Sequence, residues 1–350
     1  MSKSKIFWWF NLLLALGILT FACQNKPAKT ESKEVILKEE VASGVFPYGR
    51  LSTYGFFSGE LNQLNPSDEV ILYKPASSLF TDYALKSRFI FFPEGKKASL
   101  TSNELNFPQG TILIKNFYYP ADFRKPDGAR RIIETRLLIN EDNGWVAYPY
   151  IWNDSQTEAI LKVVGGEIEV SFTDYEGKDQ VIHNRSETLA PIGVKVQHLN
   201  NELEFKSGNI NQLAHWTELG KLEGFEGEKA HPAMINYEDN NLPLDDRAMA
   251  YLDINCSHCH SAAGPASTSG LFLTYDQTDP LKLGVNKIPV AAGNGAGTFD
   301  FDIVPGKADE SIITHRMNST EVGIAMPELG RTTVHKEGVQ LIKDWINSMK

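Results

Sequence analysis

The spacing of apolar and polar residues divides the chain into four stretches. Residues 6–22 are almost entirely apolar, and residues 24–44 are polar and charged. Between about residue 46 and residue 220, short apolar runs alternate with turns that contain Gly, Pro or Asn. This pattern predicts several short strands in an antiparallel sheet or sandwich. After about residue 242 the apolar residues repeat with helical spacing instead.

The predicted strands are rich in β-branched and aromatic residues and end at turn residues. One helix is predicted to interrupt them, because Ser155-Gln156-Thr157-Glu158 has the spacing of a capping box ahead of Ala159-Ile160-Leu161. The predicted strands cover residues 87–92, 110–119, 131–139, 145–148, 167–172 and 180–183.

Three helices are predicted in the C-terminal part. The acidic start at Asp245 and Asp246 opens the first, which runs to residue 255, and a capped helix covers residues 309–317. The chain ends in an amphipathic helix, whose apolar positions follow the helical repeat: Gly338, Leu341, Ile342, Trp345, Ile346 and Met349. Residues 221–241 are acidic and contain glycine, and we interpret them as a linker between two domains.

The first of these helices leads into the motif Cys256-Ser257-His258-Cys259-His260. This C-x-x-C-H spacing is typical of the attachment site of a c-type haem. Two thiols one helical turn apart can form thioethers with the two vinyl groups of one porphyrin, and His260 is then held under the iron as an axial ligand. We therefore predict one haem c, attached covalently through Cys256 and Cys259. His258 is expected to have no role.

Two other uses of the cysteine pair are open. The motif contains enough zinc ligands on paper, but structural zinc sites usually draw on two ligand pairs well apart in the sequence, and no second Cys/His pair exists here. A thioredoxin-like redox pair needs a βαβ context, which the surrounding pattern lacks. We favour haem over both.

A second axial ligand is expected from Met or His. Met326 precedes Pro327 in a loop between the second C-terminal helix and the last one, and we predict Met326 as this ligand. Met317, His315, His335 or an open site are the alternatives, although a Met such as Met317 more often fills a gap in a core.

Several other side chains are expected around a haem. The Pro265 carbonyl is the expected acceptor for the second ring N–H of His260. Arg316 and Arg331 are candidates for pairing with the haem propionates, with solvated surface as the alternative. Gly338 is expected where the first and last C-terminal helices cross, and Trp345 is expected to cover the haem edge.

The N-terminal stretch has the features of an export signal. Lys3 and Lys5 precede the apolar core, and a small residue stands directly before Cys23. We predict a lipoprotein signal peptide over residues 1–22, lipidation of Cys23 and a disordered tether over residues 23–44. An uncleaved transmembrane anchor and plain secretion are the alternatives. The predicted location is the cell envelope. We expect the protein to be lipid-anchored to the outer membrane and to face the periplasm.

Composition agrees with an exported globular protein. The chain has 350 residues, three cysteines and a formal net charge of −10. With Cys23 lipidated, Cys256 and Cys259 are an isolated pair, so no disulfide framework is expected. The acidic balance argues against nucleic acid as a partner and against docking on an anionic membrane through basic charge. Contact with the membrane is therefore expected only through the lipid anchor.

Together these patterns predict a multi-domain α+β protein. A β-rich, antiparallel, sandwich-like domain is expected over residues 45–220, followed by the linker at 221–241 and an all-α class I-like cytochrome c domain over residues 242–350. The segment from Leu79 to Arg88 mixes aromatic and charged side chains. It is either a partner-binding face or, as we favour, a turn whose aromatic side chains enter the β core.

Several segments are recognisable together: Ser78–Ala84, Glu134–Leu138, Tyr150–Asn153, Pro191–Gly193, Asn211–Leu213, Tyr251–His260 and Ala325–Gly330. They resemble a family of exported bacterial di-haem c-type cytochromes, with a β-rich N-terminal part and a C-terminal cytochrome c domain. The resemblance spans roughly residues 45–350, and its C-terminal motifs are the specific ones. It implies a redox protein as electron donor or acceptor in the envelope. Members resemble proteins encoded beside a parallel β-helix protein, which is therefore a candidate partner.

The chain departs from that family in one respect. Members often have another C-x-x-C-H shortly before the Pro-Ile-Gly segment, whereas residues 180–190 contain no cysteine here. We therefore predict one haem rather than two.

The favoured function is that of a c-type cytochrome, with covalent haem binding and electron transfer in the bacterial cell envelope. One alternative is a haem-containing oxidoreductase or peroxidase-like enzyme, and another is an envelope binding module with a redox domain. We expect an electron carrier rather than a catalyst, because an iron ligated by Met326 has no open position for peroxide.

Overall fold

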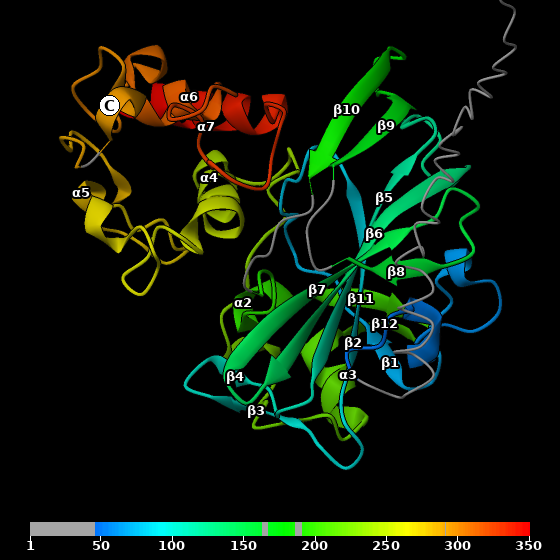
Figure 1. Cartoon of the computed structure of the whole chain (residues 1–350). Coiled ribbons are helices and arrows are strands. Elements are labelled where there is room, and N and C mark those ends of the chain that lie inside the picture. The colour runs from blue at the N-terminus through cyan, green and yellow to red at the C-terminus, as the bar shows by residue number, and fades with distance from the viewer. Residues whose placement is uncertain (1–45, 163–166, 186–190, 291) are drawn as a thin grey trace, which may run out of the picture.

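The computed structural model describes residues 46–162, 167–185, 191–290 and 292–350. The predicted signal peptide, Cys23 and the tether lie outside these ranges. Within them, no helix combines the length and the apolar character needed to span a bilayer. A strand-rich body is formed by the N-terminal residues, and a smaller body of helices and loops, formed by the C-terminal residues, lies beside it (Figure 1).

The strand-rich body contains one large sheet and three small ones. The strands are β1 (Val70–Leu72), β2 (Leu85–Phe91), β3 (Ala98–Thr101), β4 (Glu104–Asn106), β5 (Ile112–Pro120), β6 (Arg130–Glu141), β7 (Gly144–Trp152), β8 (Ala159–Leu161), β9 (Glu167–Thr173), β10 (Asp179–Arg185), β11 (Glu202–Phe205), β12 (Gly208–Asn211) and β13 (Leu222–Glu223). The α-helices of the described residues are α2 (Val196–Leu199), α3 (Gln212–Glu218), α4 (Leu244–Leu252), α5 (Pro280–Leu283), α6 (Ile312–Met317) and α7 (Lys336–Ser348).

The large sheet has the strand order β1-β2-β5-β6-β7-β8, and each neighbouring pair is antiparallel. Side chains alternate between its two faces. On one face Ile114 and Leu137 enter one apolar core, and on the other Leu113 and Leu138 enter a second core together with Trp216 of α3. Because both faces are covered, β5 and β6 are buried along most of their length. The predicted β-rich, antiparallel character of this part is confirmed.

The prediction of a helix after Ser155 is wrong. Residues Ala159–Leu161 form strand β8, which pairs with β7 at the edge of the large sheet. Asn153 organises the preceding turn, since its Oδ1 accepts hydrogen bonds from the backbone N–H groups of Thr157 (2.9 Å) and Glu158 (3.3 Å). A capping-box spacing is therefore present without a helix.

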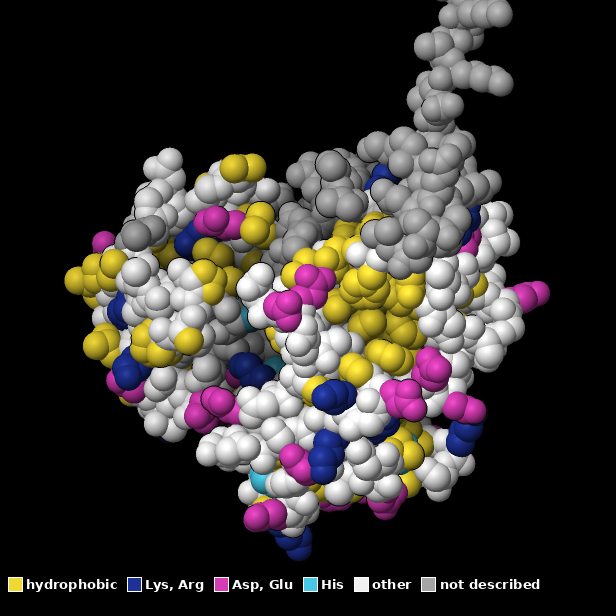
Figure 2. All heavy atoms as spheres, turned by 60° about the horizontal axis from the view of Figure 1, so that its bottom comes forward, with side chains coloured by type: hydrophobic (Ala, Val, Ile, Leu, Met, Phe, Trp, Pro, Cys, Tyr) yellow, Lys and Arg dark blue, Asp and Glu magenta, His cyan; other side chains and the backbone are white. Residues whose placement is uncertain are grey.

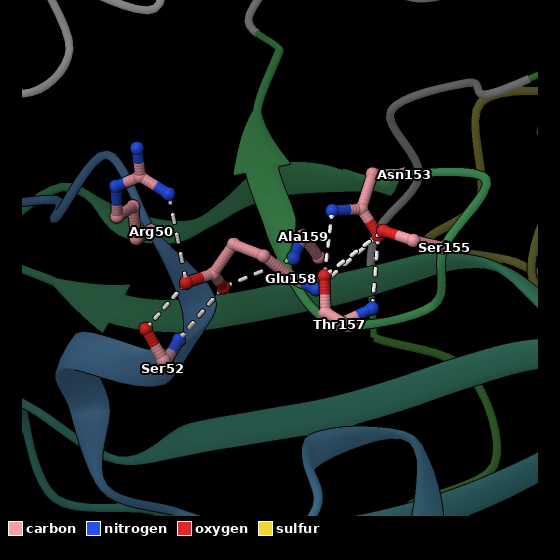
Figure 3. A network of polar contacts seen from close by, with 7 residues as sticks. All are labelled: Arg50, Ser52, Asn153, Ser155, Thr157, Glu158 and Ala159. Carbon is pink, nitrogen blue, oxygen red and sulfur yellow. Dashed lines mark hydrogen bonds and ion pairs between the residues drawn. The ribbon is translucent and has the colours of Figure 1, made fainter.

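Glu158 is engaged by residues far away in the sequence instead of by a helix end. Its carboxylate accepts a hydrogen bond from the Ser52 hydroxyl at 2.5 Å and lies 3.8 Å from Nη1 of Arg50 (Figure 3). These contacts hold the start of the described chain against the sheet edge and favour the extended backbone of β8.

The expectation of an all-α class I-like cytochrome c domain is also wrong. The structure contains 26% strand and 23% helix, with six short α-helices among the described residues. From residue 242 onwards the described chain forms α4, α5, α6 and α7, of 9, 4, 6 and 13 residues, with loops between them. Gly and Pro recur in these loops and interrupt helices, so the C-terminal body is rich in turns rather than all-α.

Helices α4 and α7 nevertheless pack against each other. A Cβ atom on Gly338 of α7 would lie 2.5 Å from the Tyr251 ring of α4, so the absence of a side chain at Gly338 permits this close contact. Tyr251 and Ile342 belong to the same apolar core, which also contains Leu252 and Trp345. This helix pair forms the base from which the loops of the C-terminal body extend.

Candidate functional site

A cavity of about 580 Å³ is lined by residues of both bodies. The C-terminal body contributes the residues after α4, helix α6 and the loop from Gly323 to Arg331, while β2, β5 and β6 form the facing wall. Lys, Arg and His side chains are visible where the two bodies meet (Figure 2). The four residues predicted to bind the haem, Cys256, Cys259, His260 and Met326, all line this cavity. Its volume is in the range of cofactor sites.

The end of α4 positions the cysteine motif. The helix continues as a wider π-helical turn, Asp253–Ser257. The backbone N–H groups of Cys259 and His260 then donate to the Cys256 carbonyl at 3.1 and 2.9 Å. One compact turn therefore presents two free thiols and one imidazole to the same cavity.

Burial determines the protonation of the motif. It raises the pKa of the Cys256 thiol to about 12 and also raises that of Cys259. Thiols with a raised pKa are poor redox nucleophiles, which counts against the thioredoxin-like alternative. Burial, with the charge of Arg316 as a further cause, lowers the pKa of His260 to about 4. The imidazole is therefore neutral at pH 7, the form that can ligate a metal.

Ser269 orients the His260 ring. Nδ1 of His260 lies 3.2 Å from the Ser269 hydroxyl oxygen, and that hydroxyl donates to the Ala266 carbonyl at 2.7 Å. Because its own proton is engaged, the Ser269 oxygen accepts from the His260 Nδ1–H, and this leaves the Nε2 lone pair for an iron. The prediction of the Pro265 carbonyl as acceptor is thus wrong.

Met326 is carried by a loop that is fixed at several points. Its backbone N–H donates to the Arg316 carbonyl at 3.0 Å, which ties the loop to α6. The Arg331 guanidinium donates from Nη2 to the carbonyl oxygens of Arg316, Ser319 and Met326 at 3.3, 2.7 and 3.1 Å. Its Nη1 donates to the Thr333 carbonyl at 2.9 Å. Arg331, considered for a haem propionate, therefore holds the Met326 loop.

The alternative axial ligands differ in their positions. Met317 and His335 also line the cavity, whereas His315 is not among its lining residues. Met317 packs into the C-terminal core. The His335 ring stacks on Phe80 with centroids 4.2 Å apart. Since both alternatives are engaged in packing, Met326 remains the predicted ligand.

The segment that begins at Leu79 joins the two bodies. The buried Asp82 carboxylate accepts hydrogen bonds from the backbone N–H and hydroxyl groups of Thr332 and Thr333 at 2.8–2.9 Å. The Tyr83 hydroxyl donates to Glu337 at the start of α7 at 2.9 Å. The segment thus binds the C-terminal part of its own chain, next to the Met326 loop. The favoured interpretation, a turn whose aromatic side chains enter the β core, holds in part: Tyr83 packs against the core that contains Phe117, while Phe80 stacks on His335.

A second network fixes the turn that carries the motif. Asp253 Oδ1 lies 2.6 Å from Nε2 of His198 on α2, and its Oδ2 accepts from the Tyr275 N–H at 2.9 Å. Lys195 lies 3.6 Å from Asp253 and donates to the Ser257 hydroxyl at 3.1 Å. Burial lowers the pKa of His198. Burial alone would raise the pKa of Asp253, but the His198 hydrogen bond and Lys195 bring it below its usual value.

Two expectations near the motif change. Trp345 lies in the core of the C-terminal body and does not line the cavity, so it does not cover a haem edge there. His258 lines the cavity, and its buried Nδ1 has no hydrogen-bond partner among the described residues. The place of His258 in the cavity was not predictable, since a position between the two cysteines carries no pattern of its own.

The facing wall is formed by cations that the sequence pattern did not single out. Arg88 on β2, Lys115 on β5 and Arg136 on β6 are direct register partners. These three side chains are only 7, 7 and 9% exposed. They line the cavity together with the half-buried Lys86. The sequence did contain one signal for these cations, a charged residue at an inward-facing position of an otherwise apolar strand.

The donor set fits a c-type haem. Two thiols, a neutral imidazole and a thioether surround one space of about 580 Å³, whose other lining includes apolar side chains such as Leu273, Ile312 and Val339. In the part of the chain that the structure describes, no group of three or more His, Cys, Asp or Glu side chains is placed to hold a metal ion.

No family model, curated protein or solved structure matches this chain. The resemblance to di-haem c-type cytochromes therefore remains a prediction that rests on the sequence motifs.

Proposed function

We propose that this chain is a c-type cytochrome that binds one haem covalently and transfers electrons in the bacterial cell envelope. One observation supports this proposal most strongly. Cys256, Cys259 and His260 line the same cavity as Met326, although Met326 lies in a distant part of the sequence. Thioether formation and two-sided iron ligation need this combination of side chains in one space.

Each side chain has a separate task in this proposal. Cys256 and Cys259 attach the porphyrin. His260, neutral and oriented by the Ser269 hydroxyl, would ligate the iron together with Met326, which is on the loop that Arg331 fixes. A bound haem supplies reversible one-electron chemistry. The chain contributes the position of the ligands and the apolar side chains that line part of the space.

The same proposal includes the location of the protein. Haem c is attached outside the cytoplasm, in agreement with the signal peptide predicted over residues 1–22 and the lipidation predicted at Cys23. We expect a redox protein of the envelope as electron donor or acceptor, and a parallel β-helix protein is a candidate for it.

The ligand assignment is tested with Met326→Ala, with Met317→Ala as the matched control. Met326→Ala should remove the Met–iron charge-transfer band from the spectrum of the oxidised protein and lower the midpoint potential, because a thioether ligand favours reduced iron. Met317→Ala should keep the band. An unchanged spectrum in Met326→Ala would show that the ligand is assigned wrongly.

The enzymatic alternative is tested by peroxide turnover. With Met326 as ligand, the wild-type protein should show no sustained peroxide consumption, and Met326→Ala should gain some because a coordination position opens. Steady turnover by the wild type would contradict the electron-carrier proposal.

A further inference from the structure

The large sheet places like charges next to one another in its centre. Arg88 of β2 is the register partner of Lys115 of β5, and Lys115 is the register partner of Arg136 of β6. Lys86 is two residues before Arg88 and therefore on the same face. Like charges directly opposite each other destabilise a sheet. A row of three, on the face that lines the cavity, would be stabilised by an anion placed against it.

The protein itself compensates these charges only in part. Arg136 pairs with Glu134 at 2.7 Å, and among the described residues it is the only one of the four cations in an ion pair. Lys86 and Lys115 donate to backbone carbonyl oxygens at 2.8–3.2 Å. Arg88 makes no side-chain hydrogen bond within the described ranges, and its Nε is buried.

Because these side chains are buried, the lack of a paired anion is energetically unfavourable. Burial, with the charges of neighbouring cations as a second cause, lowers the pKa of Lys86 and of Lys115 well below the usual value. An unpaired charge is strongly unfavourable away from water, whereas a paired and hydrogen-bonded one is tolerated. The whole protein is acidic, with a net charge of −10, so this wall is a local exception to the charge of the protein.

We propose that Lys86, Arg88, Lys115 and Arg136 form a carboxylate-binding wall, against which the occupant of the cavity places a carboxylate group. The inference rests on the proposed function, because a bound haem brings two propionate carboxylates into this space. A small free carboxylate is the other source of the same group. Arg88 is the central recognition residue, since its guanidinium makes no hydrogen bond to the described residues and Arg binds carboxylates through two parallel N–H···O bonds.

The test uses Arg88→Met in the full chain, with Arg131→Met as control. Arg131 is on β6, pairs with Asp154 at 2.9 Å and does not line the cavity. Haem content is measured first, by pyridine haemochrome. The propionate source is then tested by the infrared carboxylate bands of protein whose haem propionates carry ¹³C. The free source is tested by calorimetric titration with oxalate.

If the propionates bind the wall, their carboxylate bands shift in Arg88→Met and not in Arg131→Met. If a free carboxylate binds it, oxalate binds the wild type and Arg131→Met, and it binds Arg88→Met at least about tenfold more weakly. Unshifted propionate bands together with equal or absent oxalate binding in all three proteins would overturn the proposal.

The failure of this inference can be told apart from failure of the proposed function. A chain without haem refutes the proposed function. The oxalate titration of that haem-free chain still shows whether the wall binds a carboxylate. Arg88→Met is expected to fold, because no side-chain hydrogen bond within the described ranges is lost. If it does not accumulate, Lys115→Met, which loses one hydrogen bond to the Ile192 carbonyl, is measured in the same way.

Discussion

The Asp82 carboxylate offers the sharpest test of how the Met326 loop is held. Asp82 belongs to the β-rich body, whereas Thr332 and Thr333 follow the Met326 loop in the C-terminal body. Asp82→Asn changes one oxygen to an amide NH₂ group and keeps the size of the side chain. Asn also tolerates the left-handed backbone at this position, where φ is +46°. The substitution therefore alters the hydrogen bonds without a new steric conflict.

The magnitude follows from the hydrogen bonds. Oδ2 of Asp82 accepts from the Thr332 N–H at 2.8 Å and from the Thr332 hydroxyl at 2.9 Å. An NH₂ group at that position accepts neither, so the Thr332 N–H keeps only its 2.8 Å bond to Oδ1, and the remaining bonds lose their charged acceptor. A hydrogen bond to a charged group contributes about 1.5–3 kcal/mol, so we expect a loss of about 3 kcal/mol for the local contact. This corresponds to a roughly 100-fold larger open population of the loop.

The assay is amide hydrogen exchange of the segment from Gly323 to His335, measured by mass spectrometry on native protein. In Asp82→Asn, the amide hydrogens of this segment should exchange roughly 100-fold faster than in the wild type. In the haem-loaded protein the Met–iron charge-transfer band should weaken in parallel. Asp174→Asn is the control, because Asp174 also accepts two backbone N–H groups, at 2.8 and 2.9 Å, but does so in the turn between β9 and β10.

Unchanged exchange of the segment in Asp82→Asn would refute this account of the loop. An equal acceleration in Asp174→Asn would do the same, since it would show that the effect is a general loss of stability rather than a local release.

Three further substitutions test separate parts of the structure. Arg331→Lys replaces a guanidinium that donates to four carbonyl oxygens and holds the Met326 loop. The Met–iron band should therefore weaken, and an unaltered band would show that Arg331 does not hold the loop. Burial lowers the pKa of His335 to about 4. As the pH falls from about 6.5 towards 4, the unfolded chain therefore binds a proton that the folded protein does not, and up to roughly 3 kcal/mol of stability is lost. In urea unfolding, the free energy of unfolding of His335→Gln should fall less steeply over this pH window than that of the wild type. Equal slopes for the two proteins would exclude the effect. Gly338→Ala inserts a methyl group against the Tyr251 ring and should lower the free energy of unfolding by about 1–3 kcal/mol, while the exposed Gln340→Ala should change it little.

The main sheet was predictable because strand patterns are local. The apolar runs at residues 110–119 and 131–139 coincide closely with β5 and β6. The turn after Asn153 was not predictable in the same way. Its capping-box spacing is present, but Glu158 is held by Ser52 and Arg50, which lie about a hundred residues earlier. A contact of this range leaves no trace in the local pattern.

The same limit applies to the site. Spacing alone made Cys256, Cys259 and His260 candidates for haem binding, since one turn of the chain sets their geometry. The contact of Asp82 with Thr332 joins residues 250 positions apart, and the pairing of Lys115 with its neighbours depends on strand register. The all-α expectation failed because the motif defines one helix end and does not specify the loops that follow it.

We propose that one haem is attached covalently through Cys256 and Cys259. The most direct measurement is the intact mass of the denatured, exported protein, combined with a pyridine haemochrome titration per chain. We expect the mass of one haem per chain, retained on denaturation and lost in the double variant Cys256→Ser, Cys259→Ser. A wild-type chain with no covalently bound haem, or with two, would contradict the account.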